Sequence, residues 1–235
     1  TYRTWTAFAM RYCDARRTQY GLDVSGASNL PELHAVLFGT VALRRLKADV
    51  IGELPPKRRE ILLVKTPAAG GSLSGLRAAL LGGGGIGDGA SHVRGLLVQH
   101  YQEAARLKLP ELLRHVRATV QAERKVVFFA HHQLLLDAVQ RELSGVEHVR
   151  IDGSVGAEAR HTAVSRFQRE PRVRAAIVGI TVGGTALTLT AAQLVVFLEL
   201  YWTPGALLQA EDRLHRIGQT GTVRAQYVLG AGTVD

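Results

Sequence analysis

The stretch "LVVFLELYWTPGALLQAEDRLHRIGQ", residues 194–219, decides the fold because it joins a buried strand to a helix through a short turn. Its opening run LVVFLEL is almost wholly apolar, with Glu199 near its end, which is typical of a central strand in a parallel sheet. Thr203 and Pro204 are typical of the start of a helix, and Gly218 is typical of its end. The stretch therefore predicts a buried strand followed by a helix that continues to Gly218.

The predicted helix carries an amide and two cations on one face. At about 100° per residue, Gln209, Arg213 and Arg216 fall within one narrow arc. A second set with the same spacing forms a stripe suited to burial: Ala210, Leu214 and Ile217. Arginines on a rigid helix can bind a phosphate through two parallel hydrogen bonds, whereas a solvated basic face is the alternative. The residues alone leave both interpretations open.

Strands and helices alternate on both sides of this stretch. Further strands are predicted at 125–130, 147–151, 174–180 and 223–229, and helices at 132–143 and 156–168. Strands that alternate with helices through short loops predict an α/β fold with a doubly wound parallel sheet. Ligands of such sheets bind beyond the carboxyl ends of the strands, where the loops AHH, DGS, TVGG and YWTPG lie.

The first part of the chain has a different pattern. Apolar residues between positions 30 and 50 recur at helical spacing, which predicts a helix that starts at Asn29 and ends before the Pro-Pro pair at 55–56. A short strand is predicted at 59–65. The following region, 66–95, contains six glycines between positions 82 and 89. Because no strand precedes them and no Gly-Lys-Ser/Thr follows, they predict a flexible insert and not a phosphate loop.

The composition favours a polyanionic partner. The chain has 29 Lys and Arg against 20 Asp and Glu, a net charge of +9, which favours nucleic acid, although a basic surface can also serve solubility alone. The single cysteine excludes a disulfide framework and a cysteine zinc cluster. No apolar run is long enough to span a membrane, and the chain does not open with a basic-then-apolar leader, so we expect an intracellular protein with no membrane partner. Because the chain lacks an initiator Met and stops abruptly at GTVD, we expect it to be a piece of a longer protein.

Taken singly, the remaining motifs are weak. His131 and His132 are adjacent and point in different directions, so they predict satisfied loop histidines and no metal site. The DGS loop is by itself an ordinary turn. The sequence TVGGTAL does not match G-x-G-x-x-G, which disfavours a nicotinamide or sugar-nucleotide enzyme.

The ordered set of motifs is more specific than its members. The run QAEDRLHRIGQT after VVFLELYWTPG, preceded by TVGGTALTLTAA and RIDGS, resembles the second motor lobe of Swi/Snf-type DNA translocases. Five further segments are most similar to the HepA-related annealing helicases of that group: RYCDARR, SGASNLPELHAVL, VALRRLKADVIGELPPKRREI, FFAHH and ELYWTPG. The resemblance extends through nearly the whole chain. It implies a RecA-like parallel sheet at 96–235, preceded by the helical end of the first lobe and a linker at 1–65 and by the flexible insert at 66–95.

The resemblance also implies roles for the polar residues of the opening stretch. In that family ATP lies between two lobes, and the second lobe presents two arginines to it from the positions of Arg213 and Arg216. Arg216 matches the arginine finger, which stabilises charge on the transferring phosphoryl group. Gln209 matches a residue that positions water or the neighbouring arginine. Asp212 is expected to orient Arg216, and its alternative is a plain ion pair on the helix.

The same resemblance assigns DNA contacts to the loops. The loop TVGGTALT (181–188) is expected to couple the ATP site to the DNA backbone. It offers backbone N–H groups and hydroxyls as phosphate donors: Gly183, Gly184, Thr181 and Thr185. Three further positions match residues near the tracked DNA strand: His131, Gly153 and Ser154.

Two motifs of such a motor are absent from the sequence, namely G-x-x-x-x-G-K-[ST] and an acidic Mg²⁺ box. We expect both in a first motor lobe of the same parent chain, so ATP with Mg²⁺ would be bound mainly there and this chain alone would be inactive. The resemblance implies a nuclear, DNA-dependent ATPase that rewinds forked DNA, with a single-strand-binding protein as a partner of regions not present here. The alternative is a non-enzymatic basic DNA-binding module.

Overall fold

The computed structural model describes residues 4–43, 45, 52, 54–66, 88–182 and 187–233. The chain divides into two compact units, Thr1–Glu53 and Leu54–Asp235. The first unit contains a two-stranded antiparallel sheet, and the second contains a six-stranded parallel sheet.

In its described residues the first unit contains two helices with a hairpin between them: α1 (Trp5–Tyr12), β1 (Arg16–Thr18), β2 (Gly21–Asp23) and α2 (Leu30–Thr40). Glu32 joins the two helices, since its carboxylate accepts hydrogen bonds from Arg11 Nε (3.0 Å) and Tyr12 Oη (3.1 Å). The predicted helix start is confirmed, because Asn29 is the N-cap of α2. The predicted helix end is wrong, because α2 stops at Thr40 and Val41 follows with a non-helical backbone. The predicted apolar positions 46 and 50 lie outside the described residues.

The second unit is built on a sheet whose strands all run parallel, in the order β3-β8-β7-β4-β6-β5. The strands are β3 (Lys57–Val64), β4 (Val126–Ala130), β5 (His148–Ile151), β6 (Ala175–Gly179), β7 (Leu194–Phe197) and β8 (Val223–Gly230). The predicted doubly wound parallel sheet is thereby confirmed.

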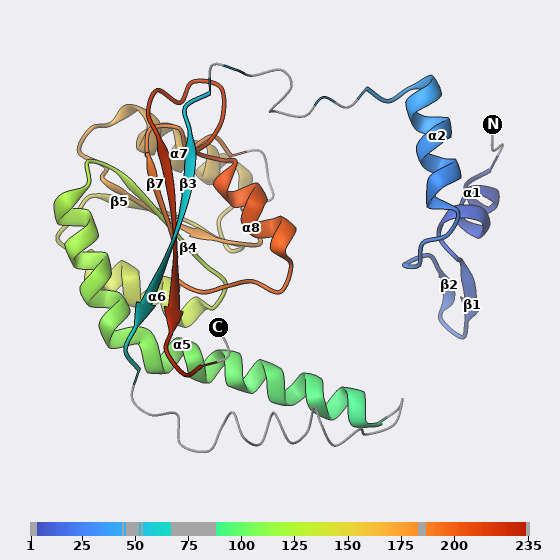
Figure 1. Ribbon diagram of the computed structural model, residues 1–235, viewed down its shortest axis with the longest axis horizontal. Helices are drawn as coiled ribbons and strands as arrows, with labels where there is room; N and C mark the ends of the chain where they lie inside the picture. Colours follow the sequence, from blue (N-terminus) through green and yellow to red (C-terminus); the bar gives the residue numbers. More distant parts are fainter. Residues whose placement is uncertain are drawn as a thin grey trace. The chain divides into compact units, whose positions relative to one another are not determined.

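Described helices cover both faces of this sheet (Figure 1). The helices α5 (Asp88–Ala122) and α6 (Gln133–Glu142) pack on one face, and α7 (Ala157–Arg169) and α8 (Pro204–Glu211) pack on the other. Successive side chains of β4 alternate between the two cores: Val127 and Phe129 contact the α7 and α8 side, and Phe128 contacts the α5 and α6 side. No described helix is long and apolar enough to span a bilayer.

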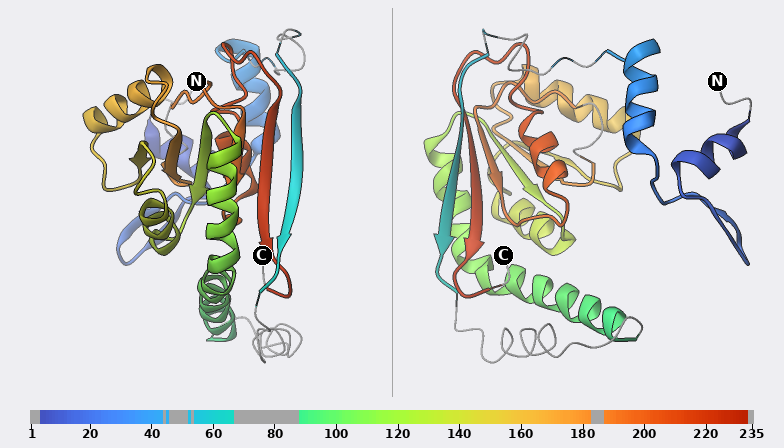
Figure 2. Two further views of the ribbon diagram at one scale, coloured as in Figure 1. Left: turned by 90° about the vertical axis from the view of Figure 1, so that its left-hand side faces the viewer. Right: turned by 45° about the vertical axis from the view of Figure 1, so that its right-hand side comes forward.

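The structure draws the boundaries of the lobe differently from the sequence pattern. The strand β3, which the pattern places before the lobe, pairs with β8 along its whole length, from Lys57 opposite Val223 to Val64 opposite Gly230. Figure 2 shows these two strands side by side at one edge of the sheet. The predicted insert at 66–95 also ends earlier, because α5 begins at Asp88. Residues 67–87 lie outside the described part of the chain.

The predicted helix through residue 217 is also corrected. The helix α8 begins at Pro204 as predicted, with Thr203 as N-cap but without a side-chain capping hydrogen bond, and it ends at Glu211. Residues 212–218 form turns, and Gly218 closes them with φ of +96°. Consequently the predicted apolar stripe is incomplete, since Leu214 is buried whereas Ile217 is 76% exposed.

Candidate functional site

The two predicted arginines lie in the turns that follow α8, in residues 212–218, which we call the arginine segment. Because the helix has ended, Gln209, Arg213 and Arg216 do not share one helical face. Gln209 is exposed on α8, Arg213 is half-buried and Arg216 is exposed. The sequence pattern therefore pointed to the two arginines, but its prediction that they lie on a helix was wrong, because they lie in turns.

The structure brings the arginine segment against the end of the glycine loop. The Leu189 N–H donates to the Arg213 carbonyl (2.9 Å), and Arg216 Nη1 donates to Thr188 Oγ1 (3.4 Å). Thr188 is the last residue of TVGGTALT, so two motifs that are separate in the sequence meet in space. Burial and then the positive charge of Arg216 lower the pKa of Arg213. A bound anion would relieve this repulsion between two neighbouring cations.

The remaining residues of the predicted nucleotide site are only partly described. Gly183 and Gly184 lie outside the described residues, as does Thr185 of the predicted DNA-binding set. Asp212 lies at the start of the arginine segment, and its Oδ1 accepts a hydrogen bond from Lys57 Nζ (3.2 Å). This contact connects Asp212 to the first residue of β3.

The residues predicted to bind DNA lie at the carboxyl edge of the sheet, where the parallel strands end. His131 follows β4, Gly153 and Ser154 follow β5, and Thr181 follows β6, and all four residues are exposed. Their strands are neighbours in the sheet, in the order β4-β6-β5. The structure therefore gathers these residues at one edge, where parallel sheets bind ligands.

A buried aspartate fixes the DGS loop at this edge. Asp152 Oδ1 accepts hydrogen bonds from the Ser154 N–H (2.9 Å) and from Ser154 Oγ (2.6 Å). Its other oxygen accepts from Arg150 Nε (2.7 Å). Although burial raises the pKa of Asp152, these hydrogen bonds lower it below its ordinary value. The loop that carries the exposed Gly153 and Ser154 is thus held by an ionised side chain.

A second buried carboxylate fixes the loop after β4. Glu199 is 1% exposed, and it accepts hydrogen bonds from the backbone N–H groups of His131 and His132 and from His132 Nδ1 (2.6 Å). The hydrogen bond to Glu199 raises the pKa of His132, whereas burial lowers the pKa of His131. The hydrogen bonds from His132 and His131 lower the pKa of Glu199 despite its burial. His132 is therefore a satisfied loop histidine, as predicted, and the role of Glu199 was missed although its place at a strand end was visible in the sequence.

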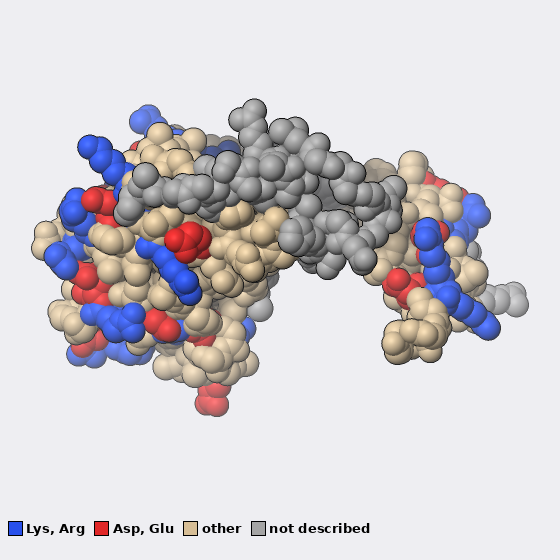
Figure 3. Space-filling view, turned by 90° about the horizontal axis from the view of Figure 1, so that it is seen from below, with Lys and Arg blue, Asp and Glu red and all other residues tan. Residues whose placement is uncertain are grey.

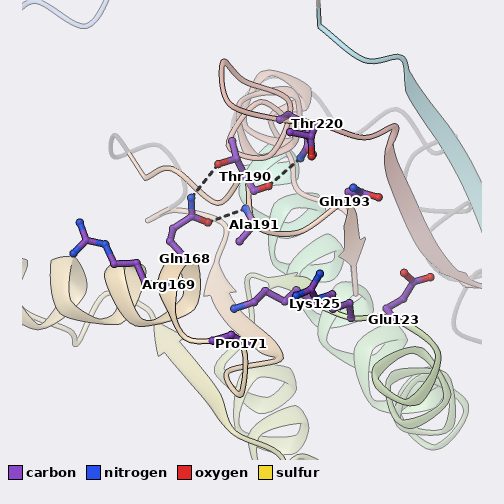
Figure 4. A pocket seen from close by; sticks show the side chains of 11 residues that line it. Glu123, Lys125, Gln168, Arg169, Pro171, Thr190, Ala191, Gln193 and Thr220 are labelled. Carbon is purple, nitrogen blue, oxygen red and sulfur yellow. Dashed lines mark hydrogen bonds between the residues drawn. The ribbon is translucent and has the colours of Figure 1, made fainter.

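A pocket of about 360 Å³ lies at the amino ends of the strands, between the start of β4 and the end of α7 (Figure 4). Its polar groups are largely paired with one another. Gln168 donates to Thr190 Oγ1 (3.0 Å) and accepts from the Ala191 N–H (2.8 Å), and Lys125 donates to the Glu170 carbonyl (2.7 Å). None of the predicted site residues lines this pocket. The described residues also contain no group of three or more potential metal ligands.

Basic side chains on the lobe do not form a single uninterrupted patch in the view of Figure 3, because acidic side chains lie between them. Several arginines of the lobe form ion pairs, among them Arg166 with Glu147 (3.3 Å) and Arg172 with Glu170 (3.2 Å). On the face shown, basic and acidic side chains are therefore interspersed, and no single broad basic patch marks a binding site there.

The class of protein follows from this fold and from a family match. Residues 107–218 match the family described as helicase conserved C-terminal domain. Two solved structures share the fold: the C-terminal part of the Fun30 ATPase domain and the Sulfolobus solfataricus SWI2/SNF2 ATPase C-terminal domain. The first has a TM-score of 0.59 at 16% identity over 77% of this chain and 87% of that chain. The second has a TM-score of 0.54 at 14% identity over 74% of this chain and 81% of that chain. Residues 107–218 therefore match a helicase C-terminal domain, and the solved structures confirm the predicted RecA-like fold.

Sequence identity to two known proteins indicates a narrower group within this class. The chain is 38% identical, over 97% of its length, to the Xenopus tropicalis SWI/SNF-related matrix-associated actin-dependent regulator of chromatin subfamily A-like protein 1, and covers 25% of that protein. It is also 38% identical, over 98% of its length, to the Homo sapiens DNA annealing helicase and endonuclease ZRANB3, and covers 22% of that protein. The chain is thus similar to a SWI/SNF-related regulator and to a DNA annealing helicase, as its motifs indicated, and spans about a quarter of the length of these relatives.

Proposed function

We propose that this chain is the second motor lobe of an ATP-dependent DNA translocase with annealing-helicase activity. The observation that carries the proposal is the contact between the arginine segment and the end of the glycine loop, through Arg213 with Leu189 and Arg216 with Thr188. One exposed and one half-buried arginine, on a segment that contacts the end of a loop of phosphate-donor type, suit a nucleotide whose other half is bound elsewhere. In the parent chain, the first motor lobe would bind most of the ATP and its Mg²⁺.

The residues of this lobe fit such a nucleotide. ATP supplies the phosphoryl bond whose hydrolysis drives translocation. The exposed guanidinium of Arg216 would donate to the terminal phosphoryl oxygens and stabilise the charge that develops on them. Arg213 would bind phosphate beside it, Gln209 would orient water or an arginine, and Asp212 would support the segment. The backbone N–H groups of Gly183 and Gly184 complete this proposed set.

The carboxyl edge would contact DNA. His131, Ser154 and Thr181 offer a ring nitrogen and two hydroxyls at the ends of neighbouring strands, Thr185 would add a third hydroxyl, and Gly153 leaves the backbone accessible. We propose that the parent protein acts in the nucleus, rewinds forked or branched DNA, and binds a single-strand-binding protein through regions outside this chain. The name of the ZRANB3 relatives supports the annealing activity in this proposal, and the family resemblance of the motifs implies the rest.

The test is ATP hydrolysis by the full parent protein, with and without forked DNA. Arg216→Ala should lower the DNA-stimulated turnover by about 10³-fold, the magnitude typical of an arginine finger. Arg169→Ala, which removes an exposed arginine of α7, should leave turnover close to the wild-type value. Full DNA-stimulated turnover by Arg216→Ala would refute the proposal.

The net charge of +9 supports one alternative, a basic DNA-binding module without enzymatic activity. Such a module would bind DNA with a steep dependence on salt and with no effect of nucleotide. If the parent protein binds DNA in this way, and shows no turnover on any DNA, the alternative is correct.

A further inference from the structure

Two buried polar side chains bracket the arginine segment. Glu211, the last residue of α8, is 0% exposed, and Gln219, which follows Gly218, is 7% exposed. Between them the backbone forms turns and lacks the continuous hydrogen-bond ladder of a helix. The positions of Arg213 and Arg216 therefore depend on what holds the two ends of this segment.

The Glu211 side chain fastens the first end to the edge of the sheet. Its carboxylate accepts hydrogen bonds from Arg59 Nε (2.7 Å) and Arg59 Nη2 (2.8 Å) of β3. It also accepts from Tyr227 Oη of β8 (2.6 Å) and pairs with Lys57 Nζ (2.7 Å). This bidentate arginine contact fixes both the position and the orientation of the carboxylate.

The backbone of the same residue holds the first turn of the arginine segment. The Glu211 carbonyl accepts hydrogen bonds from the N–H groups of Leu214 (3.1 Å) and His215 (3.0 Å). His215 is tied in addition through Nε2 to the carbonyl of Pro55 (2.7 Å), just before β3. The first half of the segment is thus anchored to the strands that lie behind it.

Gln219 fastens the second end to the loop that continues from the glycine loop. Its side-chain amide contacts three carbonyls, those of Thr190 (3.2 Å), Ala192 (2.9 Å) and Leu214 (3.2 Å). Its Oε1 accepts from the N–H groups of Thr220 (3.0 Å) and Gly221 (3.1 Å). One buried amide therefore joins the arginine segment, the loop before β7 and the approach to β8.

We infer that Glu211 and Gln219, with Arg59 and Tyr227 behind Glu211, are positioning residues that hold Arg213 and Arg216 in a productive geometry. We call these four residues the clamp. The inference rests on the proposed function, because it assigns the clamp a role in phosphoryl transfer. A displacement of about 1 Å of a positioned group can lower a rate by about 10²-fold. A segment without helical hydrogen bonds needs such external fixation more than a helix does.

The experiment uses the full parent protein and variants that leave both arginines in place. Arg59→Met removes the bidentate contact to Glu211 and keeps an apolar side chain of similar length, whereas Arg59→Lys retains a charge. Arg59→Met should lower kcat of DNA-stimulated ATP hydrolysis by about tenfold with little change in KM for ATP, and Arg59→Lys should recover most of the loss. Tyr227→Phe should give a smaller loss of the same kind.

A matched control separates positioning from general stability. Lys125→Met removes another largely buried cation, one that donates to carbonyls at the end of α7 and not to the arginine segment. It should leave kcat near the wild-type value. Hydrogen exchange without nucleotide gives a second readout, in which the amides of Leu214 and His215 should exchange faster in Arg59→Met but not in Lys125→Met.

Arg216→Ala in the same assay separates the two proposals. If Arg216→Ala loses turnover and Arg59→Met keeps it, the clamp is refuted and the proposed function stands. Unchanged exchange at Leu214 and His215 in Arg59→Met would likewise refute the clamp. If Arg216→Ala keeps full turnover, the proposed function itself fails.

Discussion

Glu211 is a fully buried carboxylate that three neighbours keep ionised. Burial alone would raise its pKa, but the hydrogen bonds from Arg59, Lys57 and Tyr227 lower it to about 2. The same contact raises the pKa of Arg59, and burial together with the hydrogen bond to Glu211 raises the pKa of Tyr227. The residue therefore links the pH dependence of stability to the structure behind the arginine segment.

This linkage predicts acid sensitivity. Because the pKa of Glu211 is lower in the folded chain than its ordinary value of 4.5, its stabilising contribution is complete above that value and is lost as the pH falls toward 2. At about 1.4 kcal/mol per pKa unit, the contribution is on the order of 3 kcal/mol. The free energy of unfolding, measured with urea, should fall between about pH 5 and about pH 3 more steeply for the wild-type chain than for Glu211→Gln. Parallel pH profiles for the two proteins would contradict this assignment.

Glu199 predicts a different titration, at the carboxyl edge. Its hydrogen bond raises the pKa of His132 above the ordinary value of 6.5. In Glu199→Gln the carboxylate is lost while the burial of His132 remains, so the pKa of His132 should fall below its wild-type value, as measured by NMR titration of the imidazole protons. Glu170→Gln, which changes an acid near the end of α7, should leave this pKa unchanged. An equal pKa in wild type and Glu199→Gln would show that the contact does not control His132.

At the scale of elements, two glycines around α8 predict effects of opposite sign. Gly218 has φ of +96°, in the left-handed region, whereas Gly205 lies inside the helix, and an added Cβ meets nothing within 4 Å at either position. Gly218→Ala should lower the free energy of unfolding by about 1 kcal/mol because of its backbone conformation. Gly205→Ala should raise it by about 0.5–1 kcal/mol because alanine favours helix. Urea unfolding of the two variants tests both signs, and a stabilised Gly218→Ala would contradict the described turn.

The end of α8 also marks the limit of what periodicity can predict. The spacing of Ala210, Leu214 and Ile217 continues a helical pattern beyond Glu211, and nothing local in the sequence interrupts it. The interruption comes from tertiary contacts, because Glu211 is fastened to β3 and Gln219 to the loop before β7. These partners lie far away in the sequence, so no window of neighbouring residues contains them.

Among strands and loops too, features with a local sequence pattern were predicted and contacts between distant residues were not. The five strands described between residues 125 and 230 were predicted to within three residues at each end, since each is an apolar or alternating run next to a helix. The position of β3 beside β8 was not predicted, because two strands more than 150 residues apart in the sequence leave no local pattern of their pairing. The hairpin β1–β2 was also missed, since its two three-residue strands are wholly exposed and show no alternation. The site residues at the carboxyl edge were found by motif, and the buried groups that hold them were not.

At the scale of the whole lobe, two sets of donors lie on different sides and one connection joins them. The carboxyl edge carries His131, Ser154 and Thr181, and the arginine segment contacts Thr188 and Leu189 at the far end of the loop that begins after β6. This connection is the structural basis that we propose for coupling DNA binding to ATP hydrolysis.

The coupling predicts that loss of one DNA contact raises the DNA concentration needed for stimulation but leaves turnover at saturating DNA nearly unchanged. A Thr181→Val variant of the parent protein keeps its shape at an exposed position but loses a hydroxyl donor to phosphate. It should require more DNA for half-maximal stimulation, by roughly five- to tenfold, while turnover at saturating DNA stays within about twofold of wild type. An unchanged DNA requirement would remove Thr181 from the DNA-binding set.

The most direct test of the central claim is the rate of ATP hydrolysis by the parent protein on forked DNA, compared between wild type and Arg216→Lys. Lysine keeps the charge but lacks the planar fork of donors, so it distinguishes a positioned guanidinium from a general positive surface. We predict that DNA stimulates the wild type and that Arg216→Lys lowers this stimulated rate by at least about 10²-fold while it still binds DNA. Equal stimulated rates for the two proteins would contradict the claim that this lobe supplies an arginine finger.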